Sequence, residues 1–267
     1  MTMAIFRDDI TQSYDLFDGE AGTYSHAGEV SPTRSTVVPI IEGKLKVPHL
    51  SKGVVRRRLT SVLGRNVRNS AGSLIVGRAG SGKTHLAAEF VKDQEVALWY
   101  TLDAGDADRL AFHHYFFTGI VKGTPEHANG SARDYSSSFE LISEINATLD
   151  GRGQKWPELL VLDGIHHLFD SDWFSSFFDI LIASLPHSSH VLMLSRSKPP
   201  NPIWRLRSKQ ILSVIDEKML AFSASEAEEL FAINHLGKKA GRDAYLESFG
   251  QPGKLVSILD SHKAAMS

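Results

Sequence analysis

The sequence of 267 residues contains no cysteine, which excludes disulfide bonds, thiol catalysis and cysteine-ligated zinc. It also has no uncharged apolar run long enough to span a bilayer. A signal peptide is not expected, because Arg7, Asp8 and Asp9 stand where its apolar core would be. The formal net charge is -2, so no global charge favours nucleic acid or anionic lipid. We therefore expect a cytoplasmic protein without membrane contact.

Short apolar segments alternate with helical patterns through most of the chain. The composition of 42% hydrophobic and 22% charged residues is sufficient for a sizeable core. Five segments are expected to be strands: Ser73–Gly77, Glu95–Leu102, Glu158–Asp163, His190–Ser195 and Gln210–Ile215. Helices are expected over Thr84–Val91, Asp108–Val121, Ser136–Leu149 and Trp173–Leu185. Strands alternating with helices indicate parallel βαβ units, so the predicted class is α/β with about five parallel strands.

The segments on either side of this region have different patterns. Met1 to about Thr36 is polar without a sustained period, which favours a mobile or loosely docked arm over a partner-binding tail. Val54 to Leu63 suits one face of a helix. After Ile215 the pattern is helical, and Ser223 with Glu226 three residues later predicts a capping box.

One motif carries the main functional prediction. The run Gly77-Arg78-Ala79-Gly80-Ser81-Gly82-Lys83-Thr84 matches GxxxxGK[ST] in full, between a predicted strand and a predicted helix. The glycines let backbone N–H groups surround a phosphate, and the helix N-terminus adds its positive dipole end. We expect Lys83 to contact the β- and γ-phosphates, Thr84 to ligate Mg²⁺ and His85 to join the nucleotide-binding set. The sequence therefore predicts a P-loop that binds ATP or ADP with Mg²⁺.

Asp163 supplies the acidic residue that such a site needs. It ends a buried strand, where P-loop NTPases have the aspartate that holds Mg²⁺. Without the P-loop, an aspartate before Gly164 would be interpreted as a turn residue. Many ATPases of this type have a second carboxylate next in sequence to orient the attacking water, and Gly164 cannot provide it. We therefore expect slow hydrolysis, and we expect Gly164→Asp to speed it, because the residue after Asp163 should project toward the γ-phosphate side.

An ordered set of further motifs resembles the nucleotide-binding domain of the MalT-type STAND ATPases, which are signalling NTPases related to AAA+ proteins. The resemblance runs from about Gly43 to the C-terminus. It rests on KLKVP with Val54-x-Arg56-x-x-Leu59, GRAGSGKT, WYTLDAGDADRLAF, LDGIHHL, SRSKPP followed by RLR, and FGQP. The P-loop alone is generic, whereas this ordered set is specific.

The resemblance implies roles for three residues outside the P-loop. Arg196 would sense the γ-phosphate, Pro252 would pack on the adenine, and Arg56 lies in a segment that contributes to the base pocket. The resemblance also implies a switch between ADP-bound closed and ATP-bound open states, which acts on a protein partner or through self-association. The DNA-binding region of the family would lie beyond FGQP and does not fit within this sequence, so DNA binding is not carried over.

The predicted organisation has three parts: a flexible arm over 1–36, a P-loop nucleotide-binding domain over 37–216 and a C-terminal helical subdomain over 217–267. Two other functions stay open. An active AAA+-like ATPase that remodels protein or DNA would show steady turnover. A degenerate module that holds ADP permanently would not exchange its nucleotide.

Several conspicuous residues have ordinary structural explanations. Adjacent histidines do not face the same way on a helix, so metal binding is disfavoured for His113, His114, His166 and His167. His166 differs from the others because it should lie near the phosphates. Helix capping is expected of Asp103, Asp106 and Asp108, with Asp103 a weak candidate near the nucleotide.

Two surface questions follow from residue spacing. A helix face that points into the core is predicted by the apolar stripe Phe174, Phe177, Phe178, Leu181, Ile182 and Leu185. Solvated surfaces are the default expectation for the basic clusters Arg56-Arg57-Arg58 and Arg205, Arg207 and Lys209. For these clusters, nucleotide-linked or interprotomer contacts come second and nucleic-acid contact third.

Overall fold

The structure is a computed structural model that describes residues 36–49, 56–92, 97–121 and 131–266. The predicted N-terminal arm therefore lies outside the described residues except for Thr36. The same holds for most of the loop predicted from Lys122 to Arg133.

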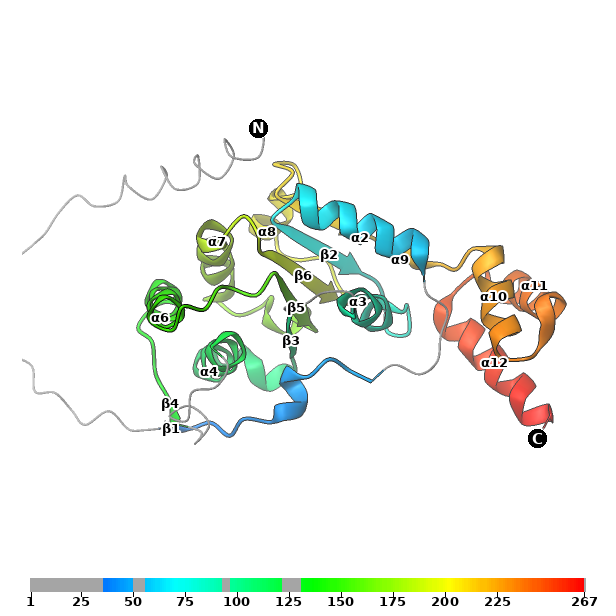
Figure 1. The fold of residues 1–267 in the computed structure, drawn as a ribbon, viewed down its shortest axis with the longest axis horizontal. Coiled ribbons are helices and arrows are strands. Elements are labelled where there is room, and N and C mark those ends of the chain that lie inside the picture. The colour runs from blue at the N-terminus through cyan, green and yellow to red at the C-terminus, as the bar shows by residue number, and fades with distance from the viewer. Residues whose placement is uncertain (1–35, 50–55, 93–96, 122–130, 267) are drawn as a thin grey trace, which may run out of the picture.

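A five-stranded parallel sheet forms the centre of the molecule, as predicted (Figure 1). Its strands are β2 (Gly72–Val76), β3 (Ala97–Thr101), β5 (Leu159–Asp163), β6 (His190–Ser195) and β7 (Leu212–Ile215). The order across the sheet is β3-β5-β6-β2-β7. Because all strands are parallel, the carboxyl ends of β5, β6 and β2 lie at one edge, where ligands bind in such sheets.

Helices cover both faces of the sheet, which explains why its strands are apolar almost without interruption. The helices α2 (Arg57–Asn69) and α3 (Lys83–Val91) pack on one face, and α4 (Arg109–Ile120), α6 (Ser138–Gly151) and α7 (Phe174–Ser184) pack on the other. In β5, Leu159 and Val161 belong to the core under α2 and α3, while Leu160 and Leu162 belong to the core under α4, α6 and α7. The apolar stripe of α7 is buried in this latter core, which confirms the prediction that the stripe faces the interior.

Two short N-terminal elements lie along the β3 side of the sheet and were not predicted. β1 (Thr36–Val37) pairs antiparallel with β4 (Ser131–Ala132), and the 3-10 helix η1 (Glu42–Leu45) follows. Lys44 from η1 contacts Asp103 Oδ2 at 2.9 Å and Asp106 Oδ2 at 2.8 Å. Both aspartates also cap the 3-10 helix η2 (Ala104–Ala107), which confirms their predicted capping function.

Helices follow the last strand, and they gather at one end of the molecule (Figure 1). The short helix α8 (Asn201–Arg205) precedes β7, and α9 (Glu217–Leu220), α10 (Ala224–Ile233), α11 (Gly237–Ser248) and α12 (Pro252–Met266) come after it. The last three share a small core of their own that includes Leu230, Phe231 and Leu255. The predicted capping box of Ser223 and Glu226 is present at the start of α10. Among the described residues, no helix combines the length and apolarity needed to cross a membrane.

Candidate functional site

The GxxxxGKT motif forms the connection between β2 and α3. β2 ends at Val76, and α3 begins at Lys83. Gly80 and Gly82 have φ angles of 75° and 83°, a backbone conformation that residues with a Cβ rarely adopt. The strand, glycine loop and helix that the motif requires are therefore all present in order.

Lys83 is directed back into this loop. Its Nζ donates to the carbonyl oxygens of Gly77 at 2.6 Å and Arg78 at 2.9 Å, and to Ser81 Oγ at 3.3 Å. Burial lowers the pKa of the Lys83 ammonium, while the charge of Asp163 acts in the opposite direction. The ammonium thus lies inside the loop, where phosphate oxygens could replace its present acceptors.

Thr84 and Asp163 meet at the carboxyl end of β5. Thr84 Oγ1 donates to Asp163 Oδ2 at 2.9 Å. Burial raises the pKa of Asp163, whereas the hydrogen bond from Thr84 and the charges of Lys83 and Arg196 lower it. A hydroxyl and a carboxylate side by side are oxygen donors of the kind that Mg²⁺ uses together with phosphates and water. These two residues could therefore hold Mg²⁺.

Arg196 immediately follows β6. This strand lies between β2, which leads to the P-loop, and β5, which ends at Asp163. The register pairs Ser195 with Val76 of β2 and Leu194 with Asp163 of β5. The Arg196 side chain is exposed. Its charge contributes to lowering the pKa of Lys83, so the two cations act on the same small region.

His166 lies in the 3-10 helix η3 (Ile165–Leu168), directly after β5. Burial, as the largest cause, and the charges of His167, Arg196 and Lys83 together lower its pKa to about 4. His166 is therefore close enough to respond to both cations of the site, as expected from its position in the sequence. At neutral pH this pKa makes the imidazole neutral.

Gly164 does not project toward the phosphate site, so the expectation for this position is wrong. Its φ angle is +90°, and a Cβ added there would lie 2.6 Å from the carbonyl oxygen of Leu102. Leu102 is the residue after β3, and its own N–H donates to the Asp163 carbonyl at 2.7 Å, so its backbone is held in place. A side chain at 164 would thus run into the backbone on the β3 side. Gly164→Asp is not a way to add a water-orienting carboxylate.

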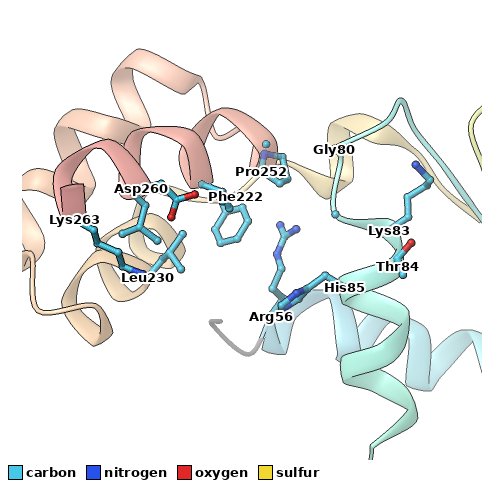
Figure 2. Close-up of a pocket in the computed structure, with 14 residues that line it drawn as sticks. Arg56, Gly80, Lys83, Thr84, His85, Phe222, Leu230, Pro252, Asp260 and Lys263 are labelled. Atoms are coloured by element: carbon cyan, nitrogen blue, oxygen red, sulfur yellow. The ribbon is translucent and has the colours of Figure 1, made fainter. Parts of the chain in front are cut away.

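A pocket of about 620 Å³ extends from the P-loop toward the C-terminal helices (Figure 2). Gly80, Gly82, Lys83 and Thr84 line one end, and residues of α10 and α12 line the other. His85 lies on its wall next to Thr84, and burial lowers the pKa of this histidine. The volume falls in the range of ordinary small-molecule sites.

Pro252 lies where α12 begins, against the P-loop. A Cβ added at Gly82 would be 3.5 Å from the Pro252 ring. The next residue, Gly253, also lies close to the loop, since a Cβ there would be 3.2 Å from the Gly80 carbonyl oxygen. The first turn of α12 therefore covers part of the P-loop, and Pro252 forms part of the pocket wall.

Arg56 lies on the same wall, and the expectation of a solvated surface is wrong for this residue. It is 3% exposed. Its Nη1 donates to the Leu220 carbonyl at 2.7 Å and its Nη2 to the Ala221 carbonyl at 2.9 Å. The guanidinium lies 4.2 Å from the Phe222 ring centroid and 3.6 Å from Glu226 Oε2. Arg56 thus joins the start of α2 to the beginning of the C-terminal helices.

Some residues of the site were not found from the sequence. Glu217 of α9 accepts hydrogen bonds from the Arg78 backbone N–H at 3.1 Å and from Arg78 Nε at 2.9 Å. Phe222 and Val256 form an apolar part of the pocket wall. No motif marked them, because their positions depend on how the C-terminal helices pack. Asp103 follows the edge strand β3, which β5 and β6 separate from the strand before the P-loop, and it pairs with Lys44, so the structure gives no support to its candidacy near the nucleotide.

This fold and this loop define a P-loop ATPase domain, a class that binds nucleotides through the loop. Residues 67–194 match the model of a family described as an AAA domain. The chain is 32% identical over 196 residues to the HTH-type transcriptional regulator MalT of Yersinia enterocolitica and 27% identical over 238 residues to that of Vibrio cholerae. The chain therefore contains an AAA-type P-loop domain that is related to the MalT regulators.

The matched lengths limit what this similarity shows. The two alignments cover 72% and 84% of this chain but 22% and 26% of the MalT proteins, so the chain spans about a quarter of their length. Among solved structures, the Walker-type ATPase PABY2304 of Pyrococcus abyssi matches with a TM-score of 0.53 and 13% identity. That match covers 80% of this chain and 71% of the other, and it concerns the fold alone.

Proposed function

We propose that this chain is a regulatory domain that binds ATP or ADP with Mg²⁺ and changes its conformation with the nucleotide. One observation carries the proposal: the P-loop forms one end of a pocket whose other end consists of the C-terminal helices. A nucleotide in this pocket contacts both parts of the chain at once. Differences between two nucleotides can therefore alter how the parts pack.

The phosphates would lie in the P-loop, against the backbone of residues 77–84. Lys83 supplies a cation to the β- and γ-phosphates, and Thr84 and Asp163 supply oxygen ligands to Mg²⁺. Arg196 is the proposed sensor of the γ-phosphate, because it follows β6 beside Asp163 and its side chain is exposed. Pro252 and Arg56, with His85, line the route from the phosphates to the base.

Three contacts join the C-terminal helices to the nucleotide-binding region. Glu217 accepts hydrogen bonds from Arg78 of the P-loop, and Arg56 donates to the carbonyls at the end of α9. Gly253 lies so close to Gly80 that a Cβ on it would be 3.2 Å from the Gly80 carbonyl oxygen. A γ-phosphate adds charge close to this junction. We propose that ADP favours the closed arrangement and ATP an open one.

The proposed output is a protein partner or self-association in the cytoplasm. The similar proteins named as HTH-type transcriptional regulators are about four times longer than the matched region, so contact with DNA is not assigned to this chain. Slow hydrolysis suits such a switch, because the ATP state then lasts long enough to be detected by a partner. An AAA+-like remodelling ATPase is the alternative, and steady turnover under multiple-turnover conditions would favour it.

Lys83→Ala tests the binding site. The change removes charge-assisted hydrogen bonds to the phosphates, each worth roughly 1.5–3 kcal/mol, so affinity should fall at least about tenfold. Fluorescent ADP and ATP analogues titrated with Mg²⁺ into wild type and variant give the comparison. Lys92→Ala is the matched control, because Lys92 follows the same helix and its side chain is 57% exposed. Equal affinities for wild type and Lys83→Ala would remove the P-loop from the proposal.

A further inference from the structure

The outer half of the pocket runs along one face of α12. This face presents Pro252, Gly253, Val256, Leu259, Asp260 and Lys263. Pro252 lies at the P-loop, and Asp260 comes eight residues later on the helix. At about 1.5 Å per residue, Asp260 is roughly 12 Å farther from the P-loop than Pro252 is. This end of the pocket is therefore the one farthest from the phosphates.

An apolar section lies between the two ends. Phe222, Leu230, Val256 and Leu259 line it. Val256 is 47% exposed, so a flat apolar group that enters the pocket can pack on it. A purine base has that shape and leaves its polar edge free. The base of a nucleotide held by the P-loop would lie in this section.

Asp260 is the polar group beyond the apolar section. Its carboxylate forms no hydrogen bond or ion pair with the described residues. In Figure 2 its carboxylate is directed from α12 toward Phe222, into the pocket. An ionised carboxylate accepts hydrogen bonds and cannot donate them, so it fits a ligand edge that carries N–H groups.

We propose that Asp260 determines base specificity by accepting a hydrogen bond from the exocyclic amino group of adenine. This inference rests on the proposed function, since it takes the phosphates to lie in the P-loop. The amino group is at the edge of adenine away from the ribose, and Asp260 is at the end of the pocket away from the P-loop. A ribose would lie closer to the phosphates, near His85 and Arg56.

Purine riboside diphosphate tests this assignment, because it equals ADP without the 6-amino group. Wild type should bind ADP roughly three- to tenfold more tightly than this analogue, as expected for one hydrogen bond to an exposed charged group. Asp260→Ala should bind the two ligands equally. Asp243→Ala is the control, because Asp243 is an exposed aspartate on α11 outside the pocket and the change in net charge is the same. This control should keep the wild-type preference.

The outcomes separate the two claims. Binding of ADP by wild type with no preference over the analogue overturns the assignment of Asp260 and leaves the P-loop proposal standing. A preference that persists in Asp260→Ala also overturns the assignment, since another group then contacts the amino group. Failure of wild type to bind ADP overturns the proposed function and this inference with it. Thermal melts of both variants show whether the fold is kept.

Discussion

Gly164→Ala is the sharpest test of the geometry next to Asp163. Gly164 follows β5 in a left-handed conformation with a φ angle of +90°. A Cβ there would approach the Leu102 carbonyl oxygen to 2.6 Å, a distance that real Cβ atoms do not show. Because the obstructing atom belongs to the backbone, it cannot move aside as a flexible side chain could.

The expected loss of stability has two parts. A non-glycine residue in the left-handed region costs about 1–2 kcal/mol. Overpacking against fixed neighbours typically adds about 1–3 kcal/mol. Gly164→Ala should therefore lower the free energy of unfolding by about 2–5 kcal/mol, within the total stability of a typical domain.

Urea unfolding of three variants separates these parts. Gly153 also has a positive φ angle, +64°, but a Cβ there meets nothing within 4 Å, so Gly153→Ala should show the strain alone. Gly151 at the end of α6 has neither problem, and Gly151→Ala should be neutral or slightly stabilising. If Gly164→Ala loses no more stability than Gly153→Ala, the argument about Leu102 is refuted. Gly164→Asp should share the loss and should not speed single-turnover hydrolysis.

Two further predictions concern buried charge. Arg56→Ala should lower the free energy of unfolding by about 3 kcal/mol, because it leaves two carbonyls and Glu226 without their buried partner. The control is Arg58→Ala, measured in the same urea series. Because the Arg58 side chain is 48% exposed, this change should lower the free energy of unfolding much less. Arg58 donates to the Met219 and Ala221 carbonyls from its exposed position, so similar losses in both variants would contradict the argument that burial makes Arg56 the important partner. Burial lowers the pKa of His113 to about 4, below the value of about 6.5 in an unfolded chain, so the unfolded state binds the proton first and stability falls as pH drops from about 6.5 to 4. His113→Phe should weaken this pH dependence in unfolding curves at pH 7.5 and 5, and an unchanged dependence would show that other groups cause it.

Local patterns in the sequence predicted most of the fold. The strand His190–Ser195 has the predicted bounds, and the capping box at Ser223 is present, since both depend on neighbouring residues alone. The P-loop was predictable for the same reason, because its glycines, lysine and threonine are consecutive. The order of strands in the sheet and the pairing of β1 with β4 could not be predicted from local patterns, because they join segments far apart in the sequence.

The errors in the site also come from long-range packing. Arg56 stands in a run of three arginines, which predicts a solvated surface, but the carbonyls of Leu220 and Ala221 come from a segment more than 160 residues away. Gly164 was expected to face the phosphates because it follows Asp163. Its left-handed backbone instead directs the Cβ position toward Leu102. Neither outcome depends on the residues adjacent in sequence.

The central claim is that the nucleotide controls how the C-terminal helices pack on the P-loop domain, and a distance between the two parts tests it most directly. The chain has no cysteine, so Asp150→Cys on α6 and Lys239→Cys on α11 give two unique labelling sites, both exposed. Spin-label distances are measured with Mg²⁺ and saturating ADP, and again with a non-hydrolysable ATP analogue. The account predicts a different distance distribution for each nucleotide, and the same distribution under both conditions when Lys83→Ala is added. Identical distributions in the doubly labelled parent, with both nucleotides shown to be bound, would contradict the switch.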